Sequence, residues 1–128
     1  MIKLEKYNKA WNPLLKSWLS ARDQDTGTDE LPEIGYLAMC DNLPVAAGFV
    51  RRCEGGYGIL DSFVTNPDAP SEIRNEALDL LASRLIEVAK NSNIKKLLAS
   101  SLDKNTIERS IRFGFKALPH TLLGLKIE

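Results

Sequence analysis

Residues 57–102 read YGILDSFVTNPDAPSEIRNEALDLLASRLIEVAKNSNIKKLLASSL. The first part, Tyr57–Thr65, is rich in aromatic, aliphatic and β-branched residues, which is typical of a strand. After two prolines, apolar residues recur every three or four positions until Asn91, and this spacing predicts the longest helix of the chain. The run Leu97-Leu98-Ala99 follows within a predicted strand over Ile94–Leu102. A strand, a crossover helix and a second strand together predict a βαβ unit.

The residues before this unit predict a strand, a helix and two more strands. Ile2–Tyr7 alternates apolar with charged residues, and a stripe of apolar side chains predicts an amphipathic helix from about residue 9 to 22. Strands are predicted over Ile34–Cys40 and Val45–Cys53. Short turns join these strands to each other and to Tyr57–Thr65, so we expect an antiparallel meander.

Two further segments complete the predicted architecture. Asp23–Pro32 is polar and acidic, and we expect an exposed, mobile loop that could select a substrate and mildly favours a cationic one. Asp103 offers an N-cap for a short helix through Arg112, which Gly114 ends. Two closing strands are predicted, over Phe115–Leu118 and Thr121–Ile127. We therefore expect one domain over residues 1–128, of the α/β (α+β) class, with a mixed, mostly antiparallel sheet of about six or seven strands and about three to four helices.

Composition excludes several classes of function. Lys plus Arg and Asp plus Glu each number 17, so no net positive charge exists to hold nucleic acid or an anionic membrane. No apolar stretch approaches the ~20 residues of a membrane span, and the N-terminus lacks the pattern of a signal peptide, so we expect a soluble cytoplasmic protein. The two cysteines and the single histidine cannot build a zinc cluster or a disulfide framework. Cys40 and Cys53 are expected to be reduced structural thiols, and His120 an exposed turn residue.

The order of these elements resembles the GNAT superfamily of acyl-coenzyme A dependent N-acetyltransferases, over almost the whole chain. Residues 63–68, FVTNPD, look like the end of the family's fourth strand and its V-x-x-P turn. Residues 105–115, NTIERSIRFGF, resemble the family's terminal helix and its ending in Gly-Phe. The resemblance implies transfer of an acetyl group from acetyl-coenzyme A to a primary amine in a direct ternary complex. It also implies a possible homodimer.

The resemblance further implies which residues hold acetyl-coenzyme A. The backbone of Phe63, Val64 and Thr65 would pair with the pantetheine arm as an added strand. Residues 71–75 would hold the pyrophosphate at a helix N-terminus, namely Ser71, Glu72, Ile73, Arg74 and Asn75. The family's glycine fingerprint is absent from this loop, and Pro70 removes one N–H donor. Asp103 stands where many members carry an Asn that meets the pantetheine arm.

Two residues are candidates for proton transfer. Asp61 lies inside a predicted strand on which the family often places a general base, although a carboxylate there can also face solvent or cap a neighbouring amide. Ser110 stands at the position of the tyrosine that protonates the departing thiolate in many members, and a serine is a poor acid for that task. Arg51-Arg52 and Lys95-Lys96 are expected at a solvated rim, or beside the 3′-phosphate of coenzyme A. The missing glycines leave a second function open, a catalytically inactive binding or regulatory protein of the same fold.

Overall fold

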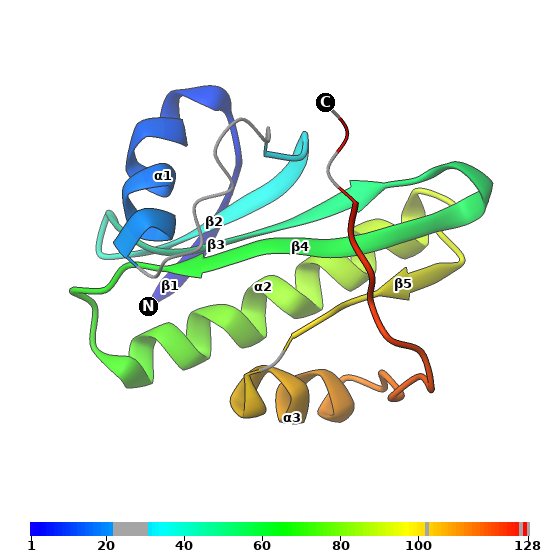
Figure 1. Cartoon of the computed structure of the whole chain (residues 1–128). Helices are drawn as coiled ribbons and strands as arrows, with labels where there is room; N and C mark the ends of the chain where they lie inside the picture. Colours follow the sequence, from blue (N-terminus) through cyan, green and yellow to red (C-terminus); the bar gives the residue numbers. More distant parts are fainter. Residues whose placement is uncertain (22–30, 102, 126, 128) are drawn as a thin grey trace. The chain divides into compact units, whose positions relative to one another are not determined.

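The computed structural model describes residues 1–21, 31–101, 103–125 and 127. The chain forms two compact units, Met1–Leu98 and Ala99–Glu128. The first unit holds a sheet whose five strands follow one another in the order β1-β2-β3-β4-β5 (Figure 1). The described part of the second unit contains one helix, α3 (Lys104–Arg112). That the whole chain folds as a single domain stays a prediction.

The strands of the first unit confirm the predicted meander and βαβ unit. The first four are β1 (Ile2–Lys6), β2 (Ile34–Cys40), β3 (Leu43–Arg52) and β4 (Tyr57–Thr65), and each pairs with the next in antiparallel fashion. The helix α2 (Ser71–Asn91) then leads to β5 (Lys96–Leu98), which pairs with β4 in parallel. Asp41 and Asn42 form the β2–β3 turn with φ of 51° and 66°. Positive φ at both positions is what a two-residue hairpin turn of the right twist requires.

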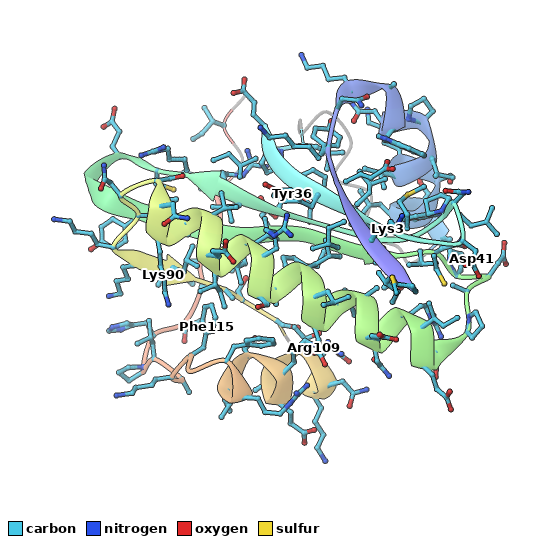
Figure 2. The ribbon with its side chains drawn as sticks, turned by 180° about the vertical axis from the view of Figure 1, so that it is seen from behind. Lys3, Tyr36, Asp41, Lys90, Arg109 and Phe115 are labelled. Atoms are coloured by element: carbon cyan, nitrogen blue, oxygen red, sulfur yellow. The ribbon has the colours of Figure 1, made fainter. Side chains whose placement is uncertain are left out.

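The two long helices of the first unit cover opposite faces of the sheet. The helix α1 (Asn12–Ala21) follows a short 3₁₀ turn and buries Leu15, Trp18 and Leu19 against one face, where they meet Leu37 of β2. The next residue of β2, Ala38, points to the other face and packs with α2. Figure 2, seen from behind, shows α2 lying across its face of the sheet close to Tyr36. Side-chain alternation along the strands therefore divides the core into an α1 face and an α2 face.

The sheet is smaller than the sequence predicts. The last strand runs over Lys96–Leu98 instead of Ile94–Leu102, and Ile94 serves as a buried residue of the α2 core before the strand begins. Neither Phe115–Leu118 nor the described part of Thr121–Ile127 forms a strand. An apolar segment forms a strand only when another strand pairs with it, and these segments leave Leu122, Leu123 and Leu125 exposed. Five strands, among the residues that the structure describes, replace the expected six or seven.

The predicted helices agree more closely with the structure than the predicted strands do. The predicted helix over residues 9–22 divides into a 3₁₀ turn, Lys9–Trp11, and α1, which ends at Ala21, and residue 22 lies outside the described residues. In the second unit the side chain of Asp103 caps α3, and Gly114 ends it with φ of 97°. The amide of Phe115 donates to the carbonyl of Ser110 across that turn, which satisfies a carbonyl at the helix end. The predicted acidic loop lies outside the described residues over 23–30.

Candidate functional site

The site begins with a β-bulge in the middle of β4. Phe49 pairs with Asp61 and Ala47 pairs with Val64, so Gly48 alone opposes the two residues Ser62 and Phe63. Ser62 occupies the left-handed region with φ of 54°. That region is uncommon for a residue with a Cβ. Such bulges insert one residue and reverse the side-chain alternation that follows.

The bulge decides which side chains reach each face. Before it, Leu60 packs on the α2 face and Asp61 lies beside Phe49 on the α1 face. After it, Phe63 packs on the α2 face and the buried Val64 packs with α1. Without the extra residue the order would be inverted, and Val64 would leave the α1 core. The bulge thus places a carboxylate on the α1 face while both cores stay apolar.

Glycine at position 48 is required by the same bulge. A Cβ placed there would come within 2.9 Å of the ring atoms Cε2 and Cζ of Phe63. Close-packed side chains do not approach that closely, so the ring can lie over β3 only because residue 48 has no side chain. Gly48 and Phe63 together fix the backbone at the centre of the sheet.

Among the residues that the structure describes, no strand pairs with the outer edge of β4 beyond the first third of the strand. Pairing with β5 covers Tyr57, Gly58 and Ile59, and the ladder stops at Ile59 and Leu98. From Leu60 to Thr65, β4 pairs with β3 on one side and has no β5 ladder on the other. Successive backbone groups of a strand point alternately to its two edges, so this segment presents N–H and C=O groups to an added strand.

Three predicted binding residues lie on that open segment. The side chains of Val64 and Thr65 are buried, with 2% and 7% of their surface exposed, and Phe63 is half-buried. A ligand at this edge can therefore be held by their backbone, which is the role predicted for them.

The loop between β4 and α2 is tied down by Asn66. Its amide N–H donates to the carbonyl of Val45 and its side-chain Nδ2 donates to the carbonyl of Pro44, both at the start of β3. Its side-chain Oδ1 accepts from the amide of Asp68, and its carbonyl accepts from the amide of Ala69. These bonds hold the start of α2 at a fixed place beside the end of β4.

The first turn of α2 provides the backbone donors. Pro70 is the N-cap, makes no side-chain capping bond and has no N–H, and the amide of Arg74 is the one that reaches back to its carbonyl. The amides of Ser71, Glu72 and Ile73 precede that first helical bond and point out of the helix end. Together with the helix dipole they form an environment that favours an anion.

Arg74 adds a charge to this turn. Its Nε is buried and has no hydrogen-bond partner within the part of the chain that the structure describes. A buried donor without a partner is costly, and an anion or a water would normally satisfy it. Of the other predicted residues, Ser71, Glu72 and Asn75 are exposed, and Ile73 packs its side chain into the α2 core. The carboxylate of Glu72 is the unfavourable charge for an anion in this turn.

Asp61 forms an ion pair that the sequence did not reveal. The Nε of Arg51 on β3 donates to its Oδ2 at 2.7 Å, and the hydroxyl of Ser62 donates to its Oδ1 at 3.2 Å. The side chains of Arg51 and Asp61 remain 43% and 34% exposed. The carboxylate of Asp61 is therefore partly exposed and paired with Arg51, and its role in proton transfer stays a prediction.

The other basic residues lie far from the start of α2. Arg52 donates to the carbonyl of Ser92 at the C-terminal end of α2, and Lys96 lies over the ring of Tyr57, 5.8 Å from its centroid. The helix α2 contains 21 residues. A helix of that length separates its two ends by about 30 Å. A phosphate at the start of α2 would therefore lie about one helix length from these two residues, and a contact of either basic pair with the 3′-phosphate stays a prediction.

The two remaining predicted residues belong to the second unit. The Oδ2 of Asp103 accepts hydrogen bonds from both the hydroxyl and the amide of Thr106, at 2.8 and 2.9 Å. These two bonds, with a smaller contribution from Arg109, hold the pKa of Asp103 below its usual value. The hydroxyl of Ser110 donates to the carbonyl of Thr106 at 2.9 Å. Both side chains thus serve α3 itself, and Ser110 has its proton engaged within its own helix.

Other kinds of site find no basis in the described residues. No group of three or more His, Cys, Asp or Glu side chains among them is arranged to hold a metal ion. Within the same residues, no helix has the length and hydropathy of a membrane span. Cys40 and Cys53 are free thiols, and His120 is exposed, as predicted.

Comparison with solved structures identifies the fold. The chain matches an acetyltransferase of the GNAT family from Staphylococcus aureus Mu50 with a TM-score of 0.73 at 15% identity, covering 99% of this chain and 95% of that one. It matches a predicted acetyltransferase with acetyl-CoA from Clostridium acetobutylicum with a TM-score of 0.71 at 17% identity, covering 98% and 96%. A transcriptional regulator from Bacillus halodurans C-125 matches with a TM-score of 0.73 at 14% identity, covering 99% and 100%. No family model and no curated protein matches the chain. The chain therefore has the fold of the GNAT acetyltransferases.

Proposed function

We propose that this protein is an N-acetyltransferase that moves an acetyl group from acetyl-coenzyme A to a primary amine. The observation that carries the proposal is the open edge of β4 from Leu60 to Thr65, which lies directly before the anion-favouring first turn of α2. A strand edge suits an extended amide-bearing arm, and the helix start suits its phosphates. The Clostridium acetobutylicum structure, solved with acetyl-CoA, supports the choice of ligand.

The residues of the helix turn fit a pyrophosphate despite the missing glycines. The amides of Ser71, Glu72 and Ile73 supply three donors whatever their side chains are. Arg74 supplies a positive charge near the start of the helix. Coulomb repulsion from Glu72 is partly offset because that side chain is exposed to solvent.

The chemistry needs a proton acceptor on the side from which the amine approaches. An ammonium acceptor must lose one proton before its nitrogen can attack the thioester carbonyl carbon, and Asp61 takes that proton directly or through a water. An amide of the open β4 segment donates to the carbonyl oxygen as negative charge develops there. The C–S bond then breaks, the sulfur leaves as a thiolate and gains the second proton of the former amine, and Asp61 releases its proton to solvent. No step depends on Ser110.

A regulatory or binding role is the second candidate. Pro70 and Glu72 weaken the anion site compared with a glycine-rich loop, and the regulator from Bacillus halodurans C-125 has the same fold. Fold likeness does not decide between a catalytic and a binding role. A protein that binds coenzyme A without transferring the acetyl group would represent this candidate.

Calorimetric titration with acetyl-coenzyme A and with coenzyme A tests the proposal. We expect a Kd in the micromolar range, weakened about tenfold or more by Arg74→Gln because a hydrogen bond to a charged group is lost. Lys90→Gln is the matched control, since it removes a positive charge from the last turn of the same helix. The absence of binding at millimolar acetyl-coenzyme A would overturn the proposal, as would an equal loss in both variants.

A further inference from the structure

The α1 face of the sheet carries a mixed surface next to the bulge of β4. Arg51, Ile59 and Leu98 are aligned across β3, β4 and β5 in one cross-strand row. Asp61 lies one step further along β4 on the same face, beside Phe49. Ile59 and Leu98 are half-buried. An apolar strip therefore lies directly beside a partly exposed ion pair.

We propose that the amine acceptor also carries a carboxylate, as an α-amino acid does, and that Arg51 binds that carboxylate while Asp61 receives the ammonium. This inference rests on the proposed function. It follows from two opposite charges, on adjacent strands, that are joined to each other at 2.7 Å and are both reachable from solvent.

The geometry of the pair matches the charges of a zwitterion. In an α-amino acid a single carbon separates the ammonium from the carboxylate, so its two charges can meet two neighbouring side chains of opposite sign. The guanidinium of Arg51 is a planar fork of N–H donors that suits a carboxylate, and its Nε is the donor that bonds Asp61. When a zwitterion replaces the Arg51–Asp61 bond, its carboxylate lies beside Arg51 and its ammonium beside Asp61. Each side chain then still has an opposite charge next to it.

The same pair disfavours other amines. A polyamine would place a second positive charge near the guanidinium of Arg51, and Lys96 on the same face adds to this repulsion. An amine without a carboxylate brings no negative charge to replace Asp61 beside Arg51 once Asp61 turns to the ammonium. The row of Ile59 and Leu98 favours an acceptor with an aliphatic side chain.

Matched acceptors test the inference. Release of the coenzyme A thiol is measured with L-leucine, with L-leucinamide, with 3-methylbutylamine, which is leucine without its carboxylate, and with spermidine. We expect kcat/KM for leucine to exceed that of each other amine by about tenfold or more, because only leucine makes the charged hydrogen bonds to Arg51. Equal or faster transfer to 3-methylbutylamine, leucinamide or spermidine would overturn the inference.

The Arg51→Gln variant assigns the preference to one side chain. We expect its kcat/KM to fall at least about ten times further for leucine than for 3-methylbutylamine, mainly through KM. Lys96→Gln, which removes a charge from the same face outside the ion pair, should keep the preference for leucine. If Arg51→Gln lowered kcat/KM equally for leucine and for 3-methylbutylamine, Arg51 would not contact the carboxylate of the acceptor.

Binding measurements separate this inference from the proposed function. Calorimetry of leucine against the protein saturated with coenzyme A gives a readout that needs no turnover. If coenzyme A binds and leucine does not, the acceptor class is wrong and the proposed function stands. If neither acetyl-coenzyme A nor coenzyme A binds, the proposed function itself fails.

Discussion

Arg51 and Asp61 join β3 to β4 on the α1 face, with the Nε of Arg51 2.7 Å from the Oδ2 of Asp61. The pair is diagonal, because Arg51 is aligned with Ile59 and Asp61 with Phe49. It lies one residue before the bulge at Ser62, whose hydroxyl also donates to the carboxylate. The ion pair thus holds the proposed proton acceptor next to the open edge of β4.

Asp61→Asn should lower kcat/KM for acetyl transfer by about a hundredfold or more, because an amide cannot accept the proton of the ammonium. The stability of the fold should change by less than about 1 kcal/mol, since a partly exposed ion pair contributes little. Thiol release and chemical denaturation provide the two readouts. Asp68→Asn, an exposed carboxylate of the β4–α2 loop, is the control. If Asp61→Asn retained the activity of the wild type, Asp61 would not be the base.

Gly48→Ala should destabilise the protein by about 1–3 kcal/mol, because its Cβ forces the ring of Phe63 to move within a packed core. Denaturation with urea measures the change. Gly124→Ala is the matched control, since nothing lies within 4 Å of a Cβ there. Phe63→Leu introduced together with Gly48→Ala should cost less than the sum of the two single changes. Additive losses would argue against the contact.

Ser62→Val should destabilise the fold by about 1–2 kcal/mol more than Ser62→Gly, since a β-branched residue tolerates positive φ least. Glycine adopts this conformation without steric cost, although it loses more entropy on folding. Thermal unfolding of both variants gives the comparison. If valine were accepted as well as glycine, residue 62 would not occupy the left-handed region.

Asp103 should titrate below the usual pKa of an aspartate, because two bonds from Thr106 stabilise its ionised form. Since the pKa is depressed in the folded state, the contribution of this cap to stability is present above about pH 4, the unfolded value. It disappears as the pH falls from there through the folded pKa. NMR titration of the carboxyl group checks the direction, and Thr106→Val should raise the pKa toward its usual value. An unchanged pKa in that variant would contradict the cause.

The sequence predicts those helices and strands whose own residues show a clear hydrophobic period. Ile34–Cys40 and Tyr57–Thr65 have the predicted bounds in the structure, because short turns enclose an apolar pattern of strand length. The helix that ends at Asn91 follows from its three- and four-residue spacing. The stripe of Trp18 and its neighbours on α1 packs into the core as expected.

Features that depend on how two strands pair cannot be predicted from the hydrophobic pattern of either strand. The bulge at Ser62 cannot be predicted from the sequence, because the strand-like composition of β4 continues before and after it. The ion pair of Arg51 and Asp61 requires the register of β3 against β4, and no pattern within either strand contains it. The closing strands predicted over 115–118 and 121–127 rest on local sequence alone, and a local pattern cannot supply a partner strand.

The candidate binding residues of β4 and α2 are predicted from the family resemblance, whereas the cap of α3 is predicted from the residues themselves. The backbone roles of Phe63, Val64 and Thr65 and the charge of Arg74 come from the resemblance to the acetyltransferases, and the open β4 edge and the buried Nε of Arg74 are consistent with them. The capping role of Asp103 follows from helix signals, and its bonds to Thr106 confirm it.

Hydrogen exchange in the presence and absence of coenzyme A tests the central claim most directly, because it reports on individual backbone amides. We predict slower exchange in β4 from Leu60 to Thr65, at about every second residue, and in residues 71–73 at the start of α2. The outer edge of β1, an edge strand at the other side of the sheet, should be unaffected. Unchanged exchange in β4 and α2 at saturating coenzyme A, or protection confined to β1, would contradict the proposed binding site.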